Sequence, residues 1–184
     1  MDKPKVIVIC GPTASGKTSL SIELAKKIEG EIVSCDSMQI YKDMDIGSAK
    51  PTKEEMQGIK HYLIDYISPK KRYSVSEYKE EASNAIKTII DKGKTPIVVG
   101  GTGLYLNSLI YNIKYNDMDV DLSYRAMLEK EAEEHGIEEL YNRAKKIDEL
   151  AMKKVSQNDK KRIIRVLEIY NATRKNQNRN WKRI

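Results

Sequence analysis

The sequence predicts an α/β fold, with a parallel sheet and flanking helices over residues 1–112 and an all-helical segment over residues 113–172. Two observations carry this prediction. As far as about Tyr111, apolar β-branched runs alternate with helical patterns, which is typical of a parallel sheet with right-handed crossovers. Beyond Tyr111 there is no further convincing strand, and the apolar residues recur at helical spacing.

The first element is a strand that leads into a phosphate-binding loop. The apolar run Val6–Cys10 precedes a G-x-x-x-x-G-K-[ST] motif, and a helix with Leu20, Leu24 and Ile28 on one face follows it. The motif consists of Gly11, Pro12, Thr13, Ala14, Ser15, Gly16, Lys17 and Thr18. A Gly-rich turn that matches by chance is the alternative, and the strand and helix on either side argue against it. We therefore expect a P-loop NTPase-like sheet.

The chemistry of the loop follows from its residue types. Backbone N–H groups of such a loop and of the following helix face an anion, and Lys17 adds a positive charge on the terminal phosphates. The hydroxyl of Thr18 suits Mg²⁺, the expected cofactor. The motif occurs in kinases, ATPases, GTPases and transferases alike, so the second substrate has to be inferred from other residues.

The remaining elements of the sheet are expected in alternation. Candidate strands are Glu31–Cys35, His61–Asp65 and Thr95–Val99, and a capping box at Ser74–Glu77 opens a helix that stops near Gly93. Ligands of parallel sheets bind outside the carboxyl ends of the strands. The phosphate loop and the residues that follow the second and fourth strands should therefore converge on one cleft.

The C-terminal part is predicted to be helical. Three helices are expected over Leu122–His135, Ile137–Val155 and Asn158–Tyr170, with breaks at Gly136 and at residues 156–159. In the last helix the basic residues share one face and the apolar residues another. This pattern fits a helix that faces RNA, but taken alone it favours an ordinary amphipathic surface helix, because such charged faces are usually just solvated.

Charge and cysteine content limit the class of protein. The chain carries 33 basic and 27 acidic side chains, a net charge of +6. Five of the bases and none of the acids fall after residue 170, so residues 173–184 are expected to form a disordered basic tail. Cys10 and Cys35 are expected to be buried and reduced. No signal peptide or membrane span is recognisable, and we expect a cytoplasmic monomer without a membrane partner.

Three polar residues are candidates for the chemistry. Asp36 follows the second strand, where it could bind Mg²⁺, accept a proton, or simply cap a turn. Gln39 offers an amide donor and acceptor, which matches the edge of an adenine. The fourth strand runs into Gly-Gly-Thr instead of an Asp, which disfavours an ordinary ATPase. Thr102 in that turn can donate a hydrogen bond to a phosphate or substrate, or be a plain turn residue.

Together the motifs resemble those of the tRNA dimethylallyltransferase family, also called tRNA isopentenyltransferases. The resemblance covers nearly the whole chain. Its motifs are GPTASGKT at Gly11–Thr18, DSMQIY at Asp36–Tyr41, MDIGSAKP at Met44–Pro51, HYLID at His61–Asp65, GGTGLY at Gly100–Tyr105 and SQNDKKRIIRVLEIY at Ser156–Tyr170. The first five motifs, in this order and spacing, are highly specific, and the resemblance extends through Ser156–Tyr170.

The resemblance implies a reaction and a set of roles. The family transfers a dimethylallyl group from dimethylallyl diphosphate to N6 of the adenosine just 3′ of the anticodon of tRNA, and it releases diphosphate. The loop would then hold the diphosphate of the prenyl donor with Mg²⁺, in place of an ATP to be hydrolysed. Asp36 would be the general base, and Thr102 would assist at the reacting centre. The residues implied in binding the anticodon stem-loop are Asp36, Ser37, Met38, Gln39, Thr102, Arg125, Lys161, Arg162, Ile163, Ile164 and Arg165.

Two other functions stay open on the sequence. A small P-loop kinase for a nucleotide or metabolite would use the same loop on ATP. Members of the family are considerably longer than this chain, and the similarity to their sequence pattern weakens near Thr173. We therefore expect a C-terminally truncated chain with an incomplete α/β core and weak or no activity. In that case the chain could be an RNA-binding remnant without catalysis.

Overall fold

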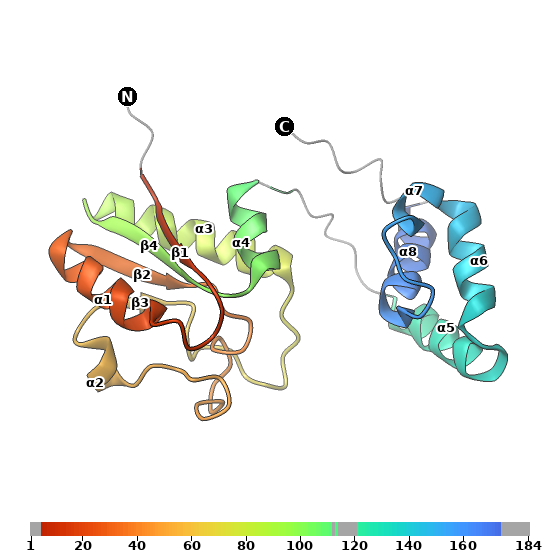
Figure 1. Cartoon of the computed structure of the whole chain (residues 1–184), viewed down its shortest axis with the longest axis horizontal. Coiled ribbons are helices and arrows are strands. Elements are labelled where there is room, and N and C mark those ends of the chain that lie inside the picture. Colours follow the sequence, from red (N-terminus) through yellow and green to blue (C-terminus); the bar gives the residue numbers. More distant parts are fainter. Residues whose placement is uncertain (1–4, 112, 114–120, 174–184) are drawn as a thin grey trace. The chain divides into compact units, whose positions relative to one another are not determined.

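The computed structural model describes residues 5–111, 113 and 121–173, and it divides the chain into two compact units, Met1–Lys114 and Tyr115–Ile184 (Figure 1). We describe each unit by itself. The elements of the first unit are β1 (Ile7–Cys10), α1 (Lys17–Lys27), β2 (Gly30–Ser34), α2 (Lys53–Met56), β3 (His61–Tyr62), α3 (Val75–Asp91), β4 (Thr95–Gly100) and α4 (Gly103–Ile110). Helices α2 and α4 are absent from the prediction made on the sequence.

The described strands form one parallel sheet in the order β1-β4-β2-β3, which confirms the predicted fold class. Strand β3 is shorter than the expected His61–Asp65 and pairs with β2 over two residues. Leu63 and Asp65 have φ angles of 58° and 55°. Such left-handed backbone cannot continue a β ladder, so the strand ends at Tyr62.

Side chains of the two central strands alternate between the faces of the sheet. On one face Val33 and Val98 pack against α3, whose buried residues are Tyr78, Ala82, Ala85 and Ile89. On the other face Ile32 and Ile97 pack against Ile22 and Ala25 of α1. The predicted capping box of α3 is confirmed, with Glu77 N donating to Ser74 Oγ and Ser74 N donating to the Glu77 carboxylate.

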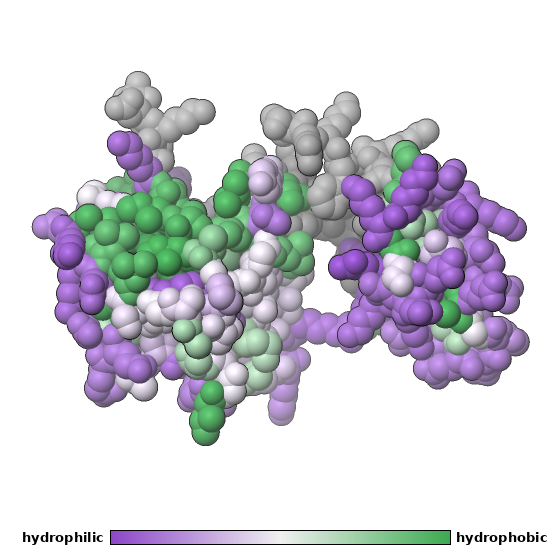
Figure 2. Space-filling view, in the orientation of Figure 1, coloured by the Kyte–Doolittle hydropathy of each residue, from purple (hydrophilic) through white to green (hydrophobic). Residues whose placement is uncertain are grey.

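Strand β1 lies at an edge of this sheet, and its position corrects two expectations. Leu20, placed by the sequence on the buried face of α1, is 56% exposed, and the residues that α1 buries are Ser21, Ile22 and Ala25. Cys10 on β1 is exposed, whereas Cys35 is buried and burial raises the pKa of its thiol to about 11. Figure 2 shows hydrophobic surface over this part of the unit. A central strand would have buried these side chains.

A buried carboxylate lies near the start of the sheet. Glu31 of β2 accepts hydrogen bonds from Lys94 Nζ at 2.8 Å, Tyr62 OH at 2.8 Å and Lys92 Nζ at 3.1 Å. Burial by itself would raise the pKa of this carboxyl group. The three hydrogen bonds outweigh that effect, and the pKa falls to about 2. Glu31 is therefore ionised in the folded state at every pH above that value.

Replacing Glu31 by glutamine is expected to lower the free energy of unfolding at neutral pH by about 2 kcal/mol, since the two lysines are half exposed and screened. The unfolded carboxyl group titrates near pH ~4.3. The stabilisation is therefore complete above that pH, and it is lost as the pH falls toward about 2. Urea unfolding between neutral and acidic pH should give a flatter pH dependence for Glu31→Gln than for wild type. Exposed Glu80→Gln is the control, and an equal pH dependence in all three proteins would contradict this assignment.

The second unit is helical, as predicted. Its elements are α5 (Leu122–His135), α6 (Ile137–Ile147), α7 (Glu149–Met152) and α8 (Lys160–Thr173). Its core consists of Leu128, Leu140, Ala144, Ala151, Met152, Ile163, Ile164, Val166 and Leu167. The break at Gly136, with φ of 87°, is confirmed. Among the described residues, no helix is both long and apolar enough to cross a bilayer.

The predicted boundaries of two helices in this unit are wrong. The expected helix Ile137–Val155 is interrupted at Asp148, whose carboxylate accepts a hydrogen bond from Ala151 N at 2.9 Å and caps α7. The last helix begins two residues later than expected, and it reaches Thr173, which the sequence assigned to the basic tail. The rest of that expected tail, residues 174–184, lies outside the described residues.

Candidate phosphate and acceptor site

The phosphate loop connects the carboxyl end of β1 to the first turn of α1. Gly16 occupies the N-cap position with a φ of 77°, and no side chain caps the helix there. A residue with a Cβ would be strained at that angle, which explains the glycine. The first N–H groups of α1 consequently have no side-chain cap, which is the arrangement that an anion-binding helix N-terminus needs.

Lys17 closes over this loop. Its Nζ donates to the carbonyl oxygen of Pro12 and lies 3.4 Å from Ser15 Oγ. Both partners belong to the loop itself, so a phosphate oxygen can replace them without disturbing the core. Thr18 is exposed beside it, and within the described ranges no cluster of three His, Cys, Asp or Glu side chains could hold a metal ion. The Thr18 hydroxyl could supply one ligand of a Mg²⁺ ion here, with phosphate oxygens of a bound substrate among the others.

The tips of three strands meet at this edge of the sheet. Cys10 of β1 is in register with Gly100 of β4, and Ser34 of β2 is in register with Val99. Cys35 continues the contact, since its N–H donates to Val99 O at 2.7 Å and its carbonyl accepts from Thr102 N at 3.1 Å. The structure thus brings the loop after β1, the residues after β2 and the turn after β4 to one edge.

Gly100 permits this close approach. A Cβ atom built on Gly100 would lie 2.1 Å from the carbonyl oxygen of Cys35. Because that neighbour is backbone in a parallel ladder, it cannot rotate away. Glycine is the residue that lets the chain after β2 reach the turn after β4.

Gly100→Ala is therefore expected to destabilise the protein by about 3 kcal/mol or more, the upper range for overpacking of a rigid core. Gly103→Ala is the matched control, because a Cβ at Gly103 meets nothing within 4 Å. Chemical unfolding of both variants measures the difference. A Gly100→Ala variant as stable as the control would mean that the two strand tips are not packed as described.

Thr102 joins the two loops through its side chain. Its Oγ1 accepts a hydrogen bond from Ser37 N at 3.0 Å and lies 3.3 Å from Ser37 Oγ. Thr102 occupies the N-cap position of α4, yet its hydroxyl does not cap that helix. The threonine instead holds the segment that follows β2.

Asp36 caps the turn that follows β2, which is one of the three roles that the sequence left open for it. Its Oδ1 accepts from Met38 N at 2.8 Å and from Gln39 N at 3.3 Å. These bonds fix the direction of the half-buried carboxylate, and both of them end on Oδ1. Asp36 can therefore stabilise the turn through Oδ1 and still accept a proton from a substrate through Oδ2. Met38 is 46% exposed beside it.

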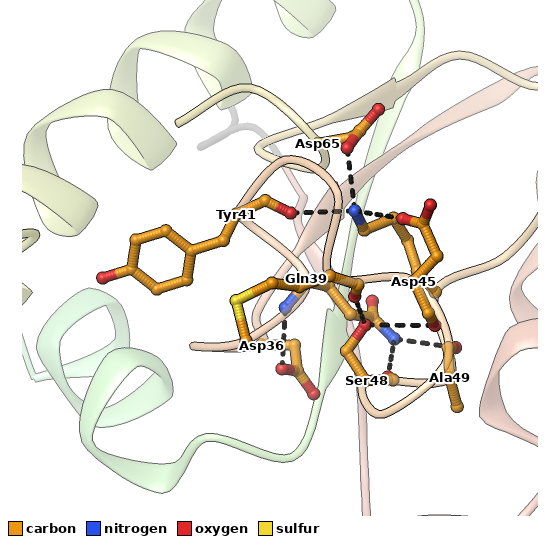
Figure 3. Close-up of polar contacts among 9 residues, drawn as sticks. Asp36, Gln39, Tyr41, Asp45, Ser48, Ala49 and Asp65 are labelled. Atoms are coloured by element: carbon orange, nitrogen blue, oxygen red, sulfur yellow. Dashed lines mark hydrogen bonds and ion pairs between the residues drawn. The ribbon is translucent and has the colours of Figure 1, made fainter. Parts of the chain in front are cut away.

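The sequence predicts that Gln39 offers a substrate both an amide donor and an amide acceptor, and the structure corrects this expectation. Its Nε2 donates to Ser48 O at 3.2 Å and to Ala49 O at 3.1 Å (Figure 3). Both amide hydrogens are therefore used within the chain, and Oε1 remains as an acceptor. Gln39 fixes the loop that carries the 44–51 motif.

Lys50 anchors the same loop, and sequence reasoning missed it. Its side chain is 5% exposed, and Nζ lies 2.6 Å from Asp45 Oδ1, 2.8 Å from Asp65 Oδ1 and 2.8 Å from Tyr41 O (Figure 3). These contacts raise its pKa, although burial opposes them. No local pattern indicates this cluster, because Asp65 is fifteen residues away along the chain.

The basic residues expected to bind RNA lie on α5 and α8. The Arg125 guanidinium pairs with Glu168, and Arg165 contacts the same carboxylate. Lys161 and Arg162 are exposed on α8. Ile163 and Ile164 are 0% and 3% exposed, and their side chains belong to the helical core. Glu168 is a further residue that the sequence analysis did not single out.

Comparisons with known proteins agree with the motifs. Residues 39–183 match the family model described as IPP transferase. The chain belongs to this family. A tRNA dimethylallyltransferase of Acetivibrio thermocellus is 56% identical over 170 residues, which are 92% of this chain and 54% of that protein. Another, from a Thermoanaerobacter species, is 50% identical over 93% of this chain and 54% of its own.

Solved IPP transferase structures share the fold. The full-length tRNA isopentenylpyrophosphate transferase of Bacillus halodurans is 43% identical, with a TM-score of 0.62 over 93% of this chain and 56% of its own. A eukaryotic dimethylallyltransferase acting on tRNA is 34% identical, with a TM-score of 0.79 over 96% of this chain and 44% of its own. The chain spans about half the length of the curated relatives it matches.

Proposed function

We propose that this protein transfers a dimethylallyl group from dimethylallyl diphosphate to N6 of the adenosine 3′-adjacent to the anticodon in tRNA, and that it releases diphosphate. Membership of the IPP transferase family supports the reaction class. The observation that carries the proposal is the meeting of the phosphate loop with Asp36 and Thr102 at one edge of the sheet. A cytoplasmic monomer is part of the same proposal.

The phosphate loop stabilises the leaving group. The N–H groups at the start of α1 and the Lys17 ammonium bind the diphosphate, whose negative charge grows as the bond to the prenyl carbon breaks. Mg²⁺ at the Thr18 hydroxyl supplies further positive charge when it is bound. ATP hydrolysis has no part in this scheme.

Asp36 acts on the acceptor. An exocyclic amine is a poor nucleophile until it loses a proton, so a positioned carboxylate is needed. The new bond joins N6 to the prenyl carbon, the bond from that carbon to the diphosphate oxygen breaks, and the N6 proton passes to Asp36. Ser37, Met38 and Gln39 line the acceptor base, and Thr102 holds this segment through Ser37.

The helical unit binds the anticodon stem-loop. Arg125, Lys161, Arg162 and Arg165 supply positive charge toward RNA phosphates. The adenosine must leave the stack of the loop to reach the catalytic edge of the sheet, as for other enzymes that modify a base. Ile163 and Ile164 support α8 from the core and leave the contacts to their neighbours.

The test is a stem-loop assay on this chain with the protein in excess over RNA. With dimethylallyl diphosphate and Mg²⁺, the RNA should gain the mass of one dimethylallyl group on the adenosine next to the anticodon. A stem-loop with guanosine at that position is the control. Thermal protection by ATP but not by dimethylallyl diphosphate, together with an unmodified stem-loop, would overturn the proposal in favour of a kinase.

A further inference from the structure

A single buried carboxylate in the helical unit joins two arginines from different helices. The Glu168 side chain on α8 is 5% exposed. Arg125 of α5 binds it as a fork, with Nε at 2.6 Å from Oε1 and Nη2 at 2.9 Å from Oε2. Arg165 of α8 adds a bond from Nη1 at 3.2 Å to Oε2. The carboxylate thus fixes both guanidinium groups.

The two arginines remain partly open to solvent. The side chains of Arg125 and Arg165 are 31% and 40% exposed, and the bonds to Glu168 use only some of their N–H donors. Two guanidinium groups and one carboxylate leave one net positive charge. One arginine would suffice to neutralise Glu168, so the second leaves further N–H donors beside it, and the exposed Glu129 of α5 also acts on Arg125 through charge.

We propose that Glu168 is a positioning residue that holds Arg125 and Arg165 as a preformed clamp for phosphates of the RNA backbone. This inference rests on the proposed function, and it adds a residue that contacts no RNA. A planar guanidinium recognises a phosphate by its N–H fork, so its orientation matters as much as its charge. Arginines held in place before binding lose less conformational entropy when the RNA arrives.

A purely structural role is the competing account, in which the Arg125–Glu168 pair only ties α5 to α8. Simple electrostatics and positioning predict opposite outcomes for one substitution. Glu168→Gln removes a negative charge, which by charge alone tightens binding to RNA and steepens its salt dependence. Loss of a preformed clamp weakens binding in spite of the added net positive charge.

The experiment is a titration of the full chain with an anticodon stem-loop RNA at several salt concentrations. Glu168→Gln should weaken the affinity about tenfold and make the salt slope shallower by up to about one unit, the loss of one phosphate contact. The matched control is Glu129→Gln. Glu129 is exposed on α5 and acts on Arg125 through charge. This variant makes the same change in charge beside Arg125 and should bind as wild type or more tightly.

The outcomes separate the inference from the proposed function. A wild-type chain that fails to bind the stem-loop would overturn the RNA-binding part of the function, and the clamp with it. Wild-type binding with an equal or tighter Glu168→Gln variant would overturn the clamp alone. Circular dichroism reports whether Glu168→Gln keeps its helices. If it does not, Arg165→Lys carries the test, because it keeps the charge and loses the fork, and unchanged RNA affinity would reject the clamp.

Discussion

Lys17→Ala is expected to abolish measurable binding of diphosphate, with an affinity loss of at least roughly a hundredfold for a charge-assisted contact. The reason is geometric as well as electrostatic. Among the residues that the structure describes, the Lys17 ammonium bonds to its own loop, through Pro12 O and Ser15 Oγ, which places it over the expected anion site. Its removal takes no hydrogen bond from the core of the sheet. The fold should therefore remain intact.

Calorimetric titration with dimethylallyl diphosphate and Mg²⁺ measures this effect. Lys27→Ala is the matched control, because Lys27 is exposed at the opposite end of the same helix. It removes the same charge and should keep wild-type affinity. Near-native binding by Lys17→Ala would show that the loop assignment is wrong.

Asp36→Asn is expected to slow prenyl transfer by ~10²–10⁴-fold, the range for loss of a general base. Affinity for the prenyl donor should stay nearly unchanged. Asparagine keeps an Oδ1 that can accept from Met38 N and Gln39 N, so the turn after β2 survives while the base is lost. The effect therefore isolates proton transfer from loop structure.

Single-turnover transfer to the stem-loop and donor titration together measure this effect. Asp43→Asn is the control, since Asp43 is exposed in the same segment and asparagine tolerates its φ of 60°. It should leave both quantities unchanged. If Asp36→Asn mainly loses donor affinity, Asp36 serves Mg²⁺ and another group takes the proton.

Local features of the fold were predictable from the sequence because they depend on neighbours in the chain. The phosphate loop, its strand and its helix are contiguous, and the Ser74–Glu77 capping box spans four residues. The alternation of strand and helix patterns predicted a parallel sheet, which the structure confirms. The second unit was predicted as helical for the same reason, since the period of its apolar residues is a local property.

Contacts between distant residues were beyond this kind of reasoning. Leu20 is 56% exposed and β1 is an edge strand, and both the exposure and the strand order are decided by how the whole sheet packs. From the sequence, the amide of Gln39 was expected to be available to a substrate. In the folded chain its Nε2 group donates to the carbonyl oxygens of Ser48 and Ala49. Likewise, no sequence pattern distinguishes Lys50 from the other lysines, and its ion pair with Asp65 forms only in the folded chain.

The sequence by itself predicted the strand and helix on either side of the glycine-rich motif, the parallel sheet and the helical second unit, and it named the candidate chemical groups. Only the tertiary structure decided which atoms of those groups remain available. One carboxylate oxygen of Asp36 accepts hydrogen bonds within its own turn, and both amide hydrogens of Gln39 are donated within the chain. Arg125 binds Glu168, which lies 43 residues away along the chain. The physical reason is that hydrogen bonds saturate, and the partner that saturates a group is set by distances in space that residue spacing does not encode.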